Sequence, residues 1–336
     1  MQSRNSSLAY LSALTLLLSY AEMVLPRFVP FFRLGLANSI ILLALNIDLK
    51  SFIILTVLKA TAASLMGGTL ISPFFIISLI QSLGSALVMR VLYKFISKKI
   101  ISLYGISIAG SAVSAVIQIL LAALYIGRGT LALLGPMLIF NTISGIITAL
   151  FSEKSGISDS VKIIEESKDE SFPNTSTNIQ SSTKSKSVQQ MLLAILLIIL
   201  SALVFFIKDL RILTAALFIA FLVQRIIFKR KIFLLPHISL WIFLLVSTMF
   251  IPNGKVLFKI WNISITQGAL LLAARKALTL STVTAFSQCA TCLKPNPHTL
   301  LGQTLEYYRK MSQCFKDAEG SIFKRIAYAL NMGKFN

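Results

Sequence analysis

A single carboxylate stands inside the first long apolar run of the sequence. Glu22 lies within LLLSYAEMVLP, the following proline-bounded loop carries Arg27 and Arg33, and Asn38 enters the next apolar run. A charge at the bilayer centre costs about 2.5–3.5 kcal/mol on insertion scales, so such a carboxylate is a candidate for binding a ligand or an ion. The structural alternative is that Glu22 lies near a helix end and pairs with Arg27.

Further polar side chains are isolated in the apolar runs that follow. Polar groups removed from water need partners, and several of them in one helical bundle predict a shared wet cavity. Glutamine and asparagine can instead simply join helices, at about 0.6 kcal/mol each. The candidate solute-binding residues are Glu22, Arg33, Asn38, Lys59, Gln81, Gln118 and Asn141. Their charges suit an anionic or amphipathic solute.

Residues for catalysis are missing from the sequence. It has no G-x-x-x-x-G-K-[ST] motif, so it does not hydrolyse ATP by itself through a P-loop. His237 and His298 are isolated, and the acids outside one polar stretch are too scattered to hold magnesium ions. Cys289 and Cys292 have only His298 nearby, too few ligands for zinc. We therefore expect no catalytic residue, no metal and no cofactor, and a protein that is not an enzyme.

The composition is that of an integral membrane protein. Of 336 residues, 56% are hydrophobic and 13% are charged, about half the charged share of soluble domains. The net charge of +20 does not indicate a nucleic-acid partner, because the basic residues stand at the ends of apolar runs. We expect an all-α polytopic fold with about ten transmembrane helices, near 8–26, 35–49, 51–71, 73–93, 101–126, 130–151, 189–207, 211–228, 232–251 and 260–286.

Composition also divides the chain. Residues 153–188 are rich in serine, threonine, lysine and glutamate, which predicts a polar cytoplasmic linker. It separates a six-helix membrane domain (1–152) from a second membrane domain (189–288), and a basic tail (289–336) follows. The tail has helix-like pieces near 299–315 and 318–330. In the second piece Ile322, Phe323, Ile326 and Leu330 recur at helical spacing, which fits an interfacial helix or a docking helix for a cytoplasmic partner.

The positions of basic residues predict the orientation. The most basic short loops are Arg90 to Lys99 and Lys229 to Lys231, so these and both termini are expected in the cytoplasm. The loop with Arg27 and Arg33 then lies outside, together with Arg128. We expect a multi-pass protein of a bacterial cytoplasmic (inner) membrane with N- and C-termini inside.

Three segments carry a family resemblance: LSYAEMVLP, RLGLANSIILLAL and LKATAASLMGGTLISPFFIISLIQSLGSALVM. They resemble the Gx transporter family, also labelled heptaprenyl diphosphate synthase component I, and through it the substrate-binding (S) components of energy-coupling factor (ECF) transporters. The resemblance covers about residues 1–152. It implies that the first outer loop covers the bound solute as a lid. It also implies that Ala9 and Ala13 form the A-x-x-x-A face that contacts a transmembrane T component.

The second half resembles a T component more weakly, through ITQGALLLAARKALTLSTVTAF, which includes Arg275. That resemblance implies that the tail, with Lys324 and Arg325, contacts ABC-type ATPase subunits, and that ATP acts only through these partners. A separate T component is a further possible partner. The expected function is solute uptake. One alternative is a non-catalytic membrane subunit of an isoprenoid, heptaprenyl diphosphate or redox-cofactor enzyme, and another is an ion-coupled carrier that uses Glu22.

Overall fold

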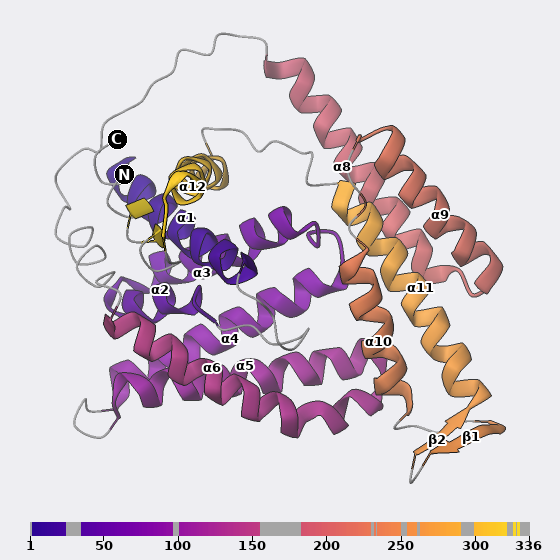
Figure 1. The fold of residues 1–336 in the computed structure, drawn as a ribbon. Helices are drawn as coiled ribbons and strands as arrows, with labels where there is room; N and C mark the ends of the chain where they lie inside the picture. Colours follow the sequence, from indigo (N-terminus) through magenta and orange to yellow (C-terminus); the bar gives the residue numbers. More distant parts are fainter. Residues whose placement is uncertain are drawn as a thin grey trace.

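A computed structural model describes residues 2–24, 35–96, 101–154, 183–229, 232, 234–249, 254–260, 263–289, 299–320, 325–326 and 328–329. These residues are almost all helical (Figure 1). In chain order the elements are α1 (Gln2–Val24), α2 (Asn38–Leu43), η1 (Ala44–Asn46), α3 (Leu49–Gly67), α4 (Pro73–Phe95), α5 (Leu103–Ile126), η2 (Arg128–Leu133), α6 (Leu134–Lys154), α8 (Thr183–Phe206), α9 (Leu210–Ile226), α10 (Leu235–Met249), β1 (Val256–Ile260), β2 (Ile263–Thr266), α11 (Gln267–Cys289) and α12 (Leu300–Asp317).

Several of these helices are long and apolar enough to cross a membrane. Among the described residues there are five: α3, α4, α5, the stretch Arg128–Lys154 and α11. Shorter apolar stretches lie at Leu8–Ala21, Ile195–Phe206 and His237–Thr248. The helical, multi-pass class expected from the sequence is therefore confirmed, whereas the count of about ten spans is not.

The second expected span, 35–49, is not a helix of membrane length. α2 has six residues and is followed by the three-residue turn η1, and most side chains of both are buried. Asp48 then begins α3, because its carboxylate accepts a hydrogen bond from the Ser51 N–H at 3.4 Å. The apolar character of 35–49 thus reflects burial inside the bundle.

Close backbone approach holds α4, α5 and α6 together. The Ser85 hydroxyl donates to the Gly110 carbonyl, and the Ser107 hydroxyl to the Gly145 carbonyl, each at 2.8 Å. A Cβ at Gly145 would lie 3.0 Å from the Ile108 Cα. Only a residue without a side chain fits there, so the three helices pack as small-residue membrane helices do.

Helices α1 to α6 pack together as a first bundle. A second bundle is built around α11, which packs against α8, α9 and α10 (Figure 1). Trp241 of α10 donates its indole N–H to the Ser281 hydroxyl at 3.1 Å, and the buried Gln224 of α9 donates to the Gln288 side chain at 2.9 Å. α8 begins at Thr183, inside the stretch expected to be linker, and residues 155–182 lie outside the described part.

The span expected at 260–286 begins later than expected. The strands β1 (Val256–Ile260) and β2 (Ile263–Thr266) pair antiparallel, and the helix starts only at Gln267. Branched side chains such as Val256, Ile263 and Ile265 favour strands over helices, which explains the difference.

The two bundles meet in a way that the charge pattern does not predict. That pattern puts the turn 68–72 outside and the end of α11 in the cytoplasm. In the structure the Ile71 N–H donates to the Ser287 hydroxyl at 2.9 Å. Hydrocarbon is about 30 Å thick, so the two ends cannot lie on opposite sides of it. In Figure 1 α4, α5 and α6 run across the direction of α11, so the expected outer end of the first bundle faces the side of α11.

Candidate functional site

Two of the predicted solute-binding residues are joined directly. The Lys59 ammonium, in the middle of α3, donates a hydrogen bond to the Asn38 side-chain oxygen at the start of α2. Both side chains are half-buried. The short α2 therefore has a clear role in this region, because it carries Asn38 to the one charged group in the middle of α3.

Hydroxyl groups of α6 surround the same turn. Gly35 has φ +73°, and a Cβ there would lie 2.8 Å from Ser144 Oγ and 2.9 Å from Thr148 Oγ1. The Thr148 hydroxyl donates to the Gly35 carbonyl at 3.2 Å, and the Ser39 hydroxyl donates to the Thr148 carbonyl at 3.4 Å. We call Gly35, Asn38, Ser39, Lys59, Ser144 and Thr148 the Lys59 cluster. It combines one cation with amide and hydroxyl groups, and none of its six members is acidic.

The other polar candidates lie on α4, α5 and α6. The Gln81 side-chain oxygen is buried and has no hydrogen-bond partner among the described residues. Gly84 faces Ile117 and Gly110 faces Met89 across the antiparallel α4 and α5, which puts Gln81 and Gln118 at the same level.

Asn141 behaves differently, because its amide donates to the Met137 carbonyl of its own helix at 2.9 Å. That hydrogen bond is local and joins Asn141 to no other element.

Not every expected residue can be placed. Glu22 falls within α1, but its side chain is outside the described part, as are Arg33 and Lys324 entirely. Arg275 is half-buried on α11. The Arg325 guanidinium donates to the Phe315 carbonyl at 2.9 Å and to the Lys316 carbonyl at 3.2 Å, so it binds the end of α12 within the chain.

The small-residue face of α1 is covered by α12. Ala9 and Ala13 are both fully buried. Ala13 stands three residues after Tyr10 and seven before Tyr20, so the three share one face of α1. Both tyrosines contact α12: Tyr10 packs edge-on against Tyr307 with ring centroids 6.1 Å apart, and Tyr20 against Phe315 at the same separation. α12 therefore packs against the face of α1 that carries Ala13. Figure 1 shows the two helices next to each other.

α12 itself is amphipathic. Thr299 begins it by accepting a hydrogen bond from the Gly302 N–H at 3.2 Å. Its buried residues Thr304, Tyr308, Met311 and Phe315 recur every three or four positions, whereas Glu306, Arg309 and Lys310 are exposed. Burial raises the pKa of Tyr308 to about 12, so this ring stays neutral against α1.

Sequence reasoning missed the polar groups where the bundles meet. Lys276 of α11 donates to the Ile126 carbonyl at the end of α5. It stands beside Arg275 within an apolar run, and a charge within an apolar run is the signal that singled out Lys59. Ser287 and Gln288 carry no comparable signal, because serine and glutamine are common at helix ends.

Replacing Asn38 with leucine should lower the thermal stability of the purified protein. The change removes one acceptor from the half-buried Lys59 ammonium, which costs about 1–3 kcal/mol. Asn38→Asp keeps the acceptor and adds a countercharge, so it should be as stable as the wild type. Asn141→Leu is the control, since its amide bonds only to its own helix. Equal melting temperatures for Asn38→Leu and Asn141→Leu would contradict a role for the Asn38–Lys59 hydrogen bond.

Comparison with known proteins divides the chain at a similar place. Residues 11–155 match the family model described as heptaprenyl diphosphate synthase component I. Residues 189–290 match a domain of unknown function (DUF8519). No curated protein and no solved structure matches the chain.

Proposed function

Because residues 11–155 match the family model described as heptaprenyl diphosphate synthase component I, we propose that the protein is an ECF-type uptake component in which a solute-binding bundle and a coupling bundle share one chain. The family name connects these residues with a membrane component of the heptaprenyl diphosphate synthase system. Transport goes beyond that name and rests on the geometry.

The position of α12 on α1 is the observation that carries the proposal. The resemblance assigns the Ala9–Ala13 face to a T component and the tail to a coupling region. The chain's own tail helix covers the face with Ala13, through Tyr20 and Phe315. One chain thus makes the contact expected between two subunits, which leaves the exposed side of α12 for cytoplasmic ATPases.

The Lys59 cluster supports a solute with an anionic group. Its ammonium can donate to a carboxylate or phosphate, whereas the Ser39 and Thr148 hydroxyls already donate to backbone carbonyls. The buried side-chain oxygen of Gln81 lies further along the same bundle. In this proposal the protein has no catalytic residue and no cofactor of its own, and ATP acts only through the partner ATPases.

Purification from the native membrane in a gentle detergent tests the proposal. We expect two ABC-type ATPases to copurify with the tagged protein and to be lost when residues 299–330 are deleted. The double variant Arg309→Ala/Lys310→Ala keeps the buried face of α12 and should also lose them, which separates docking from folding of the tail.

Two other outcomes would contradict the proposal. Copurification of a prenyl or flavin enzyme without an ATPase would favour the membrane-subunit alternative, to which the family name points. Solute uptake that needs a proton gradient and no nucleotide would favour an ion-coupled carrier.

A further inference from the structure

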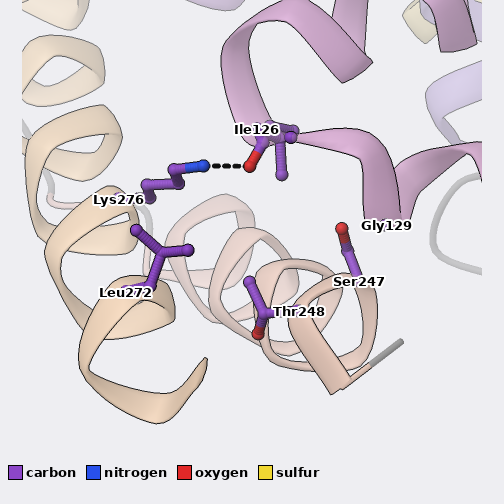
Figure 2. A pocket seen from close by; sticks show the side chains of 7 residues that line it. Ile126, Gly129, Ser247, Thr248, Leu272 and Lys276 are labelled. Carbon is purple, nitrogen blue, oxygen red and sulfur yellow. Dashed lines mark hydrogen bonds between the residues drawn. The ribbon is translucent and has the colours of Figure 1, made fainter. Parts of the chain in front are cut away.

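A cavity lies where the two bundles meet. Ile126, Gly127 and Gly129 line it from the first bundle, and Ser247, Leu272 and Lys276 from the second (Figure 2). Its volume is about 50 Å³, and part of it is open to the surroundings. One water molecule needs roughly 10–15 Å³ by this measure, so the cavity has room for a few water molecules or for a group of similar size.

Lys276 brings a positive charge to the cavity. It lies near the middle of α11, half-buried, and its ammonium reaches across to the Ile126 carbonyl (Figure 2). An ammonium has three N–H donors, and this hydrogen bond uses one of them. Within the described part of the chain, no carboxylate pairs with Lys276. A charge held in such a place without a counter-ion is costly.

The surrounding groups favour an anion. η2, α10 and α11 contain no aspartate or glutamate, and Arg128, between the two lining glycines, is exposed. The Ser247 hydroxyl is buried and points to the cavity in Figure 2. The Thr248 hydroxyl instead donates to the Leu244 carbonyl of its own helix at 2.9 Å.

The backbone leaves room for the ammonium. Gly127 has φ +118°, and a Cβ at this position would lie 3.3 Å from the Lys276 Nζ. A side chain would therefore be strained and would press on the ammonium. With glycine at this position, the Lys276 ammonium can donate to the Ile126 carbonyl at the end of α5. The two remaining N–H groups of the ammonium stay near the cavity.

We propose that this cavity binds a small oxyanion, a carboxylate or phosphate group, with Lys276 as its counter-ion and the Ser247 hydroxyl as a second donor. The anion comes from a soluble molecule or from a lipid headgroup. Because the expected outer end of the first bundle faces α11, this cavity lies beside the end at which a solute for uptake enters. A role of this cavity as a second binding site for the transported solute rests on the proposed function. The binding of an oxyanion at the cavity does not.

Thermal unfolding of the full-length protein in detergent tests the binding. At constant ionic strength, sodium phosphate or sodium acetate in place of chloride should raise the melting temperature by several degrees. Lys276→Met should weaken the apparent affinity about tenfold or more, and Lys276→Arg should keep most of it. Lys255→Met, which removes an exposed lysine outside the cavity, should respond as the wild type does.

Reconstitution distinguishes the two sources of the anion. If the anion is a lipid headgroup, the melting temperature should be higher in nanodiscs of phosphatidylglycerol than in nanodiscs of phosphatidylcholine, and free anions should not raise it further.

If Lys276→Met does not fold, Ser247→Ala, which keeps the ammonium, should weaken binding at least threefold. The proposal would be overturned if neither anions nor phosphatidylglycerol raised the melting temperature. It would also be overturned if the rise were equal in the wild type, Lys276→Met and Ser247→Ala. ATPases are not needed, so this result is independent of the copurification test.

Discussion

Phe315→Ala is expected to release α12 from α1 and to remove the ATPases from the purified protein. Phe315 is 1% exposed, its ring packs on Tyr20, and the Arg325 guanidinium lies 4.6 Å from the ring centroid. Truncating such a phenylalanine costs about 3–5 kcal/mol. Phe315 lies on a peripheral helix, so this loss of stability should detach α12 locally before the bundles unfold.

Limited trypsin digestion measures this detachment. Arg309 and Lys310 are exposed on α12, and cleavage there requires the helix to open. A loss of about 3 kcal/mol raises the open population about a hundredfold, and cleavage should accelerate accordingly. Phe206→Ala is the matched control, because Phe206 is 81% exposed on α8. Trypsin resistance and ATPase recovery equal to those of Phe206→Ala would mean that Phe315 does not hold α12.

Local patterns were enough to predict much of this architecture. Long apolar helices and a tail helix near 299–315 were predicted, and the structure has both. The amphipathic spacing was predicted for 318–330, most of which lies outside the described residues. Lys59 and Asn38 stood out because each is polar within an apolar run, and the structure joins them. Glu22 stood out for the same reason, and Arg33 stood out as a cation in the loop that follows it. The side chains of both lie outside the described residues, so their part in the site stays a prediction.

The errors have physical causes. An apolar run reads the same whether lipid or protein surrounds it, so the buried α2 was predicted as a span. The contact of Ile71 with Ser287 joins positions 216 residues apart, and no local pattern encodes it. The charge rule describes loops relative to a membrane, and it does not give the angle at which two bundles meet.

Gly68 should be the position where a single methyl group most disturbs the contact between the bundles. It ends α3 at φ +69°, and a Cβ there would lie 2.7 Å from Gln288 Cγ and 3.0 Å from Gln288 Cα. The left-handed conformation costs a non-glycine residue about 1–2 kcal/mol, and the overpacked contact adds about 1–3 kcal/mol. Gly68→Ala should therefore lower the stability by roughly 2–5 kcal/mol.

Two further variants separate strain from contact. Gly67→Ala puts the same methyl group one residue earlier, where only Thr69 Oγ1 lies within reach, at 4.0 Å. In an ordinary helical position this change stabilises by about 0.5–1 kcal/mol. Asparagine tolerates the left-handed backbone conformation, but its Cβ would still clash with Gln288. Gly68→Asn should therefore lose as much stability as Gly68→Ala only if the clash, and not the backbone strain, causes most of the loss. A disulfide crosslink engineered by the paired substitutions Ile71→Cys and Ser287→Cys reports the contact: it should form with Gly67→Ala and fail with Gly68→Ala. Equal crosslinking in both would mean that Gln288 does not lie against Gly68, and that the bundles are held together elsewhere.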